Sequence, residues 1–293
     1  MIPNNNLSVL PWYTSIDQQN ARKWWVYGRV YPLFTPAGYL LPFQILFPYI
    51  SNPVINACIL YDANTNTIVD SSVAHKLTET GFSFEQFQLL GYTVGVYPGG
   101  VPVFTSMQNG QYYLRITVNN INYYSEIFTV VNDITPYLKI EWWDVENFVM
   151  DAGVIAYKYA NGTQFKNVLY LQADIAKPEY TFDEEGENRD GYFFPTKQIS
   201  EKKYRFAFYA SEYLLDVMRF IRMADYAEIT NAGQRYSLDT FLITPDWEDN
   251  GDVAAVEAEF NTATVAKKIG LAYIKAQRGD FNDDFNNDFN NQQ

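Results

Sequence analysis

The fold of this 293-residue chain is decided by one stretch, Gly110-Gln111-Tyr112-Tyr113-Leu114-Arg115-Ile116-Thr117-Val118. It is rich in Tyr, Ile, Thr and Val, which favour β-strands, and the Asn119-Asn120 pair that follows predicts a turn. The run 121–131 then predicts another strand. Short strands at this spacing, joined by turns of Gly and Asn, favour a β-sandwich.

The same strand pattern continues on both sides of this stretch. Upstream, the runs 54–61 and 67–70 flank an Asn-rich turn and 91–97 predicts a further strand, so a β-sandwich domain is expected over 54–134. A second β-rich domain is expected over 135–262. Its predicted strands are 137–143, 154–159, 168–173, 203–208, 226–230 and 237–243.

Three segments depart from the strand pattern. Ser211 is a candidate N-cap, and apolar residues recur after it at helical spacing, which predicts one clear helix at about 211–224. The acidic run 183–190 is too polar to pack and predicts an exposed loop, whereas 82–90 fits a short helix or a loop. The predicted fold class is therefore mainly β, with two β-sandwich-like domains.

Residues 1–53 hold seven of the chain's 13 prolines and many aromatic residues. Proline at this density disfavours regular helices and central strands. We interpret the segment as an extended aromatic arm with short strands that lies mainly against other chains; the alternative is a strand-poor opening to the first domain. Its candidate interface residues are Trp12, Trp24, Trp25 and Phe43.

The last segment, 263–293, ends in a low-complexity repeat of four residues that places Phe281, Phe285 and Phe289 at equal spacing. Such a polar tract has no core of its own, so we expect the three rings to insert into pockets on a neighbouring protein. The alternative is a solvated tail. The repeat fails as a calcium loop, because Phe285 stands where Gly is needed and Asn291 where Glu is needed.

The composition narrows the possible partners and chemistry. The net charge of −13 and the absence of a basic stripe argue against gripping nucleic acid, although DNA passing through an acidic channel remains possible. The single histidine, His75, rules out a multi-histidine metal site, and Cys58 lies in an apolar run typical of an inert buried thiol. No Gly-rich phosphate loop occurs. We therefore expect no catalytic residue, no cofactor and no metal.

The ends and apolar runs of the sequence indicate where the protein is made. The N-terminus has neither a basic region nor an apolar run typical of a signal peptide, and the apolar stretch 40–50 is interrupted by prolines. The expectation is synthesis in a bacterial cytoplasm and no membrane association.

Several blocks of the sequence stand out together in the N-terminal arm, in the two central strands and in the C-terminal half. They are Leu10-Pro11-Trp12-Tyr13, Arg22-Lys23-Trp24-Trp25-Val26-Tyr27-Gly28, Leu41-Pro42-Phe43-Gln44-Ile45, Gly110-Gln111-Tyr112-Tyr113-Leu114, Tyr123-Tyr124-Ser125-Glu126-Ile127-Phe128 and Tyr213-Leu214-Leu215-Asp216-Val217-Met218-Arg219, with Trp247 and Glu259-Phe260. These blocks resemble structural proteins of tailed phages that infect Bacteroidales, crAss-like phages included. The resemblance implies a virion tail component and carries over no catalytic residue.

These observations predict a virion structural protein that assembles as a symmetric ring in the phage tail or head–tail connection. Its arm and tail would lock neighbouring subunits, because closed symmetry multiplies each interface. The alternative is a carbohydrate-binding β-sandwich whose exposed aromatic rings stack on sugars. A glycan-degrading enzyme is a weaker third reading, since an acidic chain always offers carboxylate pairs.

Overall fold

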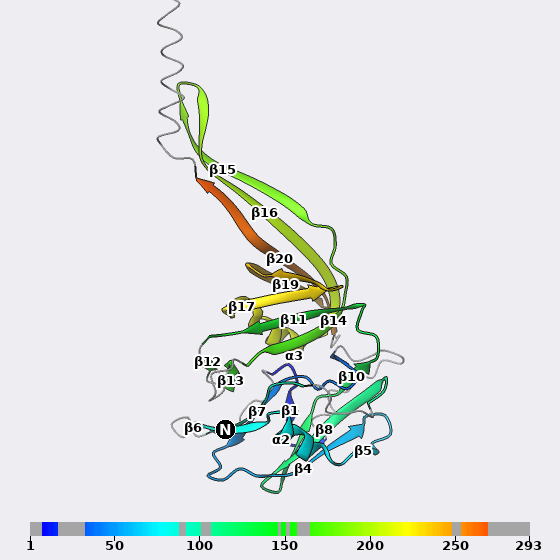
Figure 1. Cartoon of the computed structure of the whole chain (residues 1–293). Coiled ribbons are helices and arrows are strands. Elements are labelled where there is room, and N and C mark those ends of the chain that lie inside the picture. Colours follow the sequence, from blue (N-terminus) through cyan, green and yellow to red (C-terminus); the bar gives the residue numbers. More distant parts are fainter. Residues whose placement is uncertain are drawn as a thin grey trace, which may run out of the picture.

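The computed structural model describes residues 8–16, 33–87, 92–100, 107–145, 148–150, 153–156, 165–247 and 253–268. Strands dominate these residues, and they are arranged in sheets of eleven, four, three and two strands. Figure 1 shows a compact body from which one long sheet projects. The predicted mainly β fold class is confirmed.

The largest sheet is built on the stretch that decides the fold. Its first part contains β1 (Trp12–Tyr13), β4 (Ile55–Asp62), β5 (Ile68–Asp70), β8 (Gly110–Val118), β9 (Ile121–Ser125) and β10 (Phe128–Val131). Strand β8 is central because β4 pairs with it on one side and β9 and β10 on the other. Its alternate residues Tyr112, Leu114, Ile116 and Val118 are buried, as the period of a strand requires.

The run predicted as one strand over 121–131 is interrupted. Asn119 and Asn120 form the expected turn, with φ of 46° and 65°, the left-handed values of a tight hairpin. The interruption follows Ser125, and it buries the carboxylate of Glu126. Tyr13 donates a hydrogen bond of 2.8 Å to Glu126 Oε2, and the Ile127 N–H donates one of 2.9 Å to Oε1, so the carboxylate is paired.

A three-stranded sheet packs on the first part of the large sheet. It contains β3 (Phe43–Pro48), β7 (Tyr92–Tyr97) and β6 (Ser83–Phe87), in the order β3-β7-β6. Ring contacts join the two layers, with centroids 4.9 Å apart for both Trp12–Phe43 and Phe47–Tyr123. This arrangement is β-sandwich-like. It corrects the prediction of a helix or loop at 82–90 for residues 83–87, which pair with β7 as a strand; residues 88–90 lie outside the described residues.

The large sheet continues across the boundary expected between residues 134 and 135. Strand β2 (Phe34–Pro36) lies parallel to β10 and also pairs with the second part of the sheet through Phe34 and Tyr170. That part contains β11 (Tyr137–Trp143), β14 (Asn167–Gln172), β17 (Tyr226–Asn231) and β18 (Gln234–Ser237), while β12 (Phe148–Met150) and β13 (Gly153–Ala156) form a separate pair. One continuous hydrophobic core therefore serves both predicted domains.

The predicted helix is present and is shorter than expected. Helix α3 (Glu212–Met218) begins after Ser211, whose extended backbone suits an N-cap position, and a 3-10 turn, η3 (Ile221–Met223), follows. Its apolar face, including Leu214, Val217 and Met218, is buried. A second helix, α2 (Val73–Glu79), was not predicted; Val73 and Leu77 place it on the core.

The fourth sheet projects from the body in Figure 1 and has the order β15-β16-β20-β19. Its strands are β15 (Glu179–Arg189), β16 (Tyr192–Ser211), β20 (Val253–Lys268) and β19 (Thr240–Trp247). The loop predicted at 183–190 is wrong, because most of it lies in β15. Its backbone pairs with β16 along the whole strand, so an acidic segment with solvent on both faces is still a strand.

Candidate assembly surface

The base of the projecting sheet is anchored in the body by one apolar face. Tyr204, Phe206 and Phe208 alternate along β16 and are buried, and Phe260 of β20 stacks on Tyr204 with ring centroids 5.2 Å apart. The intervening residues Ala207 and Tyr209 are exposed. The base is therefore held by a one-sided core, as in an ordinary half-buried sheet.

The outer half of the sheet has no such core among the described residues. Every side chain from 179 to 188 in β15 is exposed. The exposed fractions of Tyr180 and Phe182 are 71% and 65%, and the strand period places both rings on one face. Opposite residues of an antiparallel pair share a face, so Lys202, opposite Tyr180, lies between the rings of Tyr180 and Tyr204, at 5.7 and 5.0 Å from their centroids.

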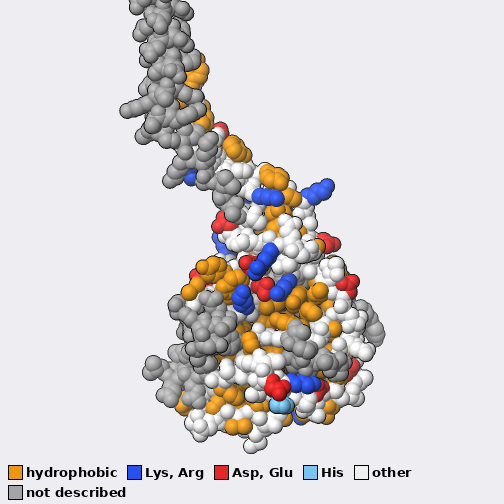
Figure 2. Space-filling model, in the orientation of Figure 1, with side chains coloured by type: hydrophobic (Ala, Val, Ile, Leu, Met, Phe, Trp, Pro, Cys, Tyr) orange, Lys and Arg blue, Asp and Glu red, His pale blue; other side chains and the backbone are white. Residues whose placement is uncertain are grey.

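The tip of the β15–β16 hairpin is also aromatic. Asp190 and Gly191 form its turn with φ of 53° and 84°, the pair of left-handed conformations that an Asp-Gly turn supplies. Directly after the turn, Tyr192 and Phe193 are 71% and 49% exposed. Figure 2 shows hydrophobic side chains on this projecting part of the molecule, interspersed with basic and acidic ones. Exposed aromatic residues grouped in this way are typical of interaction surfaces.

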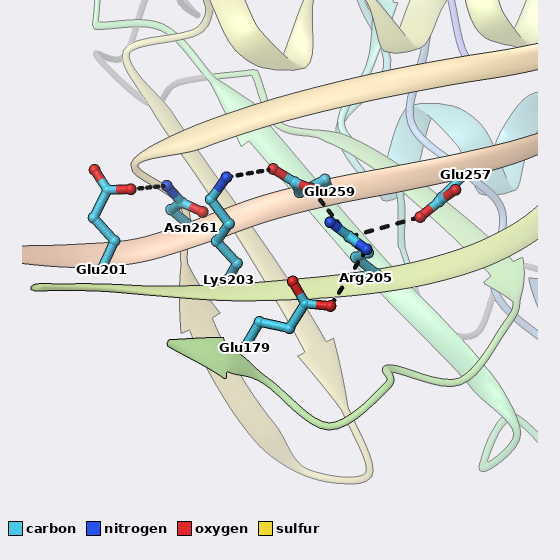
Figure 3. A network of polar contacts seen from close by, with 7 residues as sticks. All are labelled: Glu179, Glu201, Lys203, Arg205, Glu257, Glu259 and Asn261. Atoms are coloured by element: carbon cyan, nitrogen blue, oxygen red, sulfur yellow. Dashed lines mark hydrogen bonds and ion pairs between the residues drawn. The ribbon is translucent and has the colours of Figure 1, made fainter. Parts of the chain in front are cut away.

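The opposite face of the sheet carries a network of charged residues, drawn in Figure 3. At its centre, Lys203 and the Arg205 Nε each donate a hydrogen bond of 3.1 Å to Glu259, one to each carboxylate oxygen. The hydrogen bond from Lys203, together with that from Arg205, lowers the pKa of Glu259. These contacts tie β16 to β20.

Two further carboxylates surround Arg205. Its Nη1 lies 3.3 Å from Glu179 of β15, and its Nε lies 3.7 Å from Glu257 of β20. On the same face, Asn261 donates to Glu201 at 3.4 Å. The network drawn in Figure 3 holds four glutamates and two cations, so this face is net negative. It links the three long strands and offers no excess of positive charge to nucleic acid.

The structure corrects the expectation for two of the predicted interface residues. Trp12 is 2% exposed and Phe43 is fully buried, and they contact one another in the core of their own chain. They have no surface left for a partner. The physical reason is that Pro36 and Pro48 are the last residues of β2 and β3, so these prolines end strands and do not prevent them.

The other predicted interface residues lie outside the described residues. They are Trp24 and Trp25 of the arm and Phe281, Phe285 and Phe289 of the terminal repeat. The exposed aromatics of the projecting sheet were missed by sequence reasoning. The signal was the Tyr180-Thr181-Phe182 alternation followed by Asp190-Gly191, which together are typical of a hairpin.

The two residues considered for chemistry, Cys58 and His75, have surroundings that do not indicate a catalytic role. Burial raises the pKa of the Cys58 thiol, which disfavours the reactive thiolate. His75 is on the exposed side of α2, where its Nε2 lies 3.2 Å from Glu79, one helical turn on. In the described ranges, no group of His, Cys, Asp and Glu is placed to hold a metal ion. The same ranges contain no helix long and apolar enough to cross a membrane.

Comparison with protein-family models and with curated proteins finds no match to this chain. The projecting sheet and the blocks of sequence quoted above are the features of the chain that bear on its function.

Proposed function

We propose that this chain is a virion structural protein that assembles as a symmetric ring in the tail or head–tail connection of a phage. One observation carries the proposal. A four-stranded sheet extends out of the body and exposes aromatic side chains over its outer half, where the described residues of the chain give them no core. Such a surface is costly to leave in water and is typical of a subunit that other chains cover. The resemblance to phage structural proteins supports the same reading.

The arm and the tail keep their proposed role in a narrower form. Because Trp12 and Phe43 belong to the subunit's own core, the locking contacts with neighbouring subunits are assigned to Trp24, Trp25 and the three phenylalanines of the terminal repeat. The net negative charge and the acidic network suit a passive DNA channel, since repulsion keeps DNA from sticking. No catalytic step is part of this function.

Native mass spectrometry of the purified full-length protein, together with mass spectrometry of purified virions, tests the proposal. We expect one discrete oligomer of high order and the presence of the chain in the particle at a fixed copy number. A protein that stays monomeric over a hundredfold range of concentration and is missing from virions would overturn it.

A carbohydrate-binding function is the second candidate, and the exposed rings of Tyr180 and Phe182 on one sheet face favour it. The stacked pair Trp143–Tyr226 does not, because Lys166 lies 4.0 Å over the Trp143 ring. Binding to a glycan array that is lost in Tyr180→Ala and Phe182→Ala, with no oligomer formed, would favour this candidate over the ring.

A further inference from the structure

The outer half of the projecting sheet has two edges. β15 pairs with β16 on one side, and β20 residues Val265 to Lys268 pair with the other side of β16. Strand β19 reaches along β20 only as far as Asn261. Among the described strands, none pairs with the outer side of β15 or with that outer part of β20. Within the described residues, each edge therefore has backbone N–H and C=O groups that a further strand could pair with.

We propose that β15 of one copy of this chain adds to the outer part of β20 of the next copy, so that the projecting sheets join into one continuous sheet around the ring. The inference rests on the proposed self-assembly and names the elements that perform it. The occupant of each edge is thus a second copy of the chain. A head-to-tail contact of this kind closes into a ring when the rotation between copies divides a full turn.

The direction of the strands fits this junction. β15 and β20 are both antiparallel to β16, so they run the same way, outward from the body. Copies related by rotation about an axis along the projection all point the same way. Their junction is therefore parallel, whereas every pairing within the projecting sheet is antiparallel. Closure removes all the exposed edges of the outer sheet, the general advantage of a barrel.

Charge favours the pairing of β15 with β20 over the pairing of β15 with β15 of another copy. β15 carries Asp183, Glu184, Glu185 and Glu187, whereas the outer end of β20 has the sequence Lys267-Lys268. Pairing β15 with β15 of another copy places the acidic runs against each other, which is unfavourable. Pairing β15 with β20 brings opposite charges together. Charge complementarity therefore selects the head-to-tail arrangement.

The backbone register places these residues at the same height. Glu184 is opposite Gln198, which is opposite Lys267, and Glu185 is opposite Lys197, which is opposite Lys268. In a ring whose strands follow its axis, rotation keeps heights unchanged, so Glu184 and Glu185 of one copy meet Lys267 and Lys268 of the next. Phe182 and Val265 are also at the same height, because Phe182 is opposite Ser200 and Ser200 is opposite Val265.

A disulfide trap in the full-length chain tests the junction directly. Phe182→Cys and Val265→Cys are introduced together, and single variants serve as controls. Within one chain β16 separates the two positions by two strand spacings, about 10 Å between Cα atoms, which is beyond the reach of a disulfide. The native thiol of Cys58 is buried and does not compete. Neighbouring positions 264 and 266 are tested in parallel to allow for strand tilt.

Oxidation of the double variant should give a ladder of covalent oligomers that ends at the size of the ring, as seen on non-reducing gels. Each single variant should stay uncrosslinked. A covalent dimer from Phe182→Cys alone would show β15 against β15 and overturn the inference. Absence of any ladder at 264, 265 and 266 would also overturn it.

Charge exchange gives a second, independent measurement. Glu184→Lys with Glu185→Lys, or Lys267→Glu with Lys268→Glu, should each weaken assembly at least tenfold at low salt, and all four changes together should restore it. Glu79→Lys with Asp174→Lys reverses two exposed carboxylates outside the projecting sheet and should leave assembly unchanged. Glu185 also pairs with Lys197 at 2.8 Å, so circular dichroism checks that each variant is folded. Failure of the four changes to restore assembly would contradict the inference.

The two proposals fail in different ways. A discrete ring by native mass spectrometry without a disulfide ladder leaves the ring function standing and removes this junction. A ladder and charge rescue in a protein that virions lack keeps the junction and removes the virion role. A monomer without a ladder removes both.

Discussion

At the scale of single residues, comparing Phe43 with Phe182 distinguishes a residue of the core from a residue of the proposed interface. Phe43 is fully buried beside Trp12, whereas Phe182 is 65% exposed. We expect Phe43→Ala to lower the free energy of unfolding of the subunit by about 3–5 kcal/mol, because it leaves a cavity. Phe182→Ala, the matched control, should change it by less than about 0.5 kcal/mol. Urea unfolding at low protein concentration measures both, and equal effects would contradict the assignment.

Glu259 makes a prediction about acid stability. The hydrogen bond from Lys203, with that from Arg205, lowers its pKa in the folded protein. A group with a lowered pKa stabilises the fold above its unfolded pKa, about 4.3, and loses that contribution as the pH falls through the folded value. Melting temperatures from pH 7 to 3 should therefore fall less steeply in Glu259→Gln. Glu257→Gln, whose contact with Arg205 is longer at 3.7 Å, should follow the wild type.

At the scale of elements, the hairpin turn of β15 and β16 depends on Gly191. Its φ is 84° and a Cβ there meets no atom within 4 Å, so Gly191→Ala introduces backbone strain and no clash. The strain of about 1 kcal/mol should open the tip more often and speed amide exchange near it about fivefold. Asp190→Asn keeps a residue that tolerates the left-handed conformation and should leave exchange unchanged. Hydrogen-exchange mass spectrometry resolves the two variants.

The elements also show which parts of the fold can be predicted from sequence. Strands β8 and β11 were predicted with the bounds observed, because buried residues alternate along each of them. Strand β15 was missed because no face of it is buried, so the Tyr180-Thr181-Phe182 alternation is short and gives way to the acidic run at 183–187, where no alternation of apolar and polar residues continues. The strand forms because its backbone pairs with β16, and such pairing between two segments cannot be read from the sequence of β15 alone. The exposed rings of the candidate surface were missed for the same reason.

The N-terminal arm shows the opposite error. Proline density predicted a segment without a core, yet Leu33, Phe34, Phe43 and Phe47 are buried in the shared core. The aromatic content was the better signal, since a strand can end at a proline and still bury the residues before it. Sequence alone could not say whether those rings would meet their own chain or a neighbour.

At the scale of the whole molecule, the proposed assembly requires contacts that one chain does not complete. The terminal repeat provides the last test, because its sequence places Phe281, Phe285 and Phe289 among polar residues alone. Each ring buried on a neighbour contributes roughly 1.5–3 kcal/mol, while each ordered residue costs about 1–2 kcal/mol of backbone entropy. We therefore expect the tail to be a weak anchor in one copy and to become effective when it is repeated around the proposed ring.

Truncation after Arg278 should accordingly leave a folded subunit with an unchanged melting temperature that assembles poorly. Native mass spectrometry at several concentrations should show the loss as a shift towards monomer. Replacing the three phenylalanines by serine in the full-length chain is the matched variant, because it keeps the length and charge of the tail. If the junction between β15 and β20 alone holds the ring, both variants assemble normally and the anchoring role is wrong; if the rings are the anchors, both fail to the same degree.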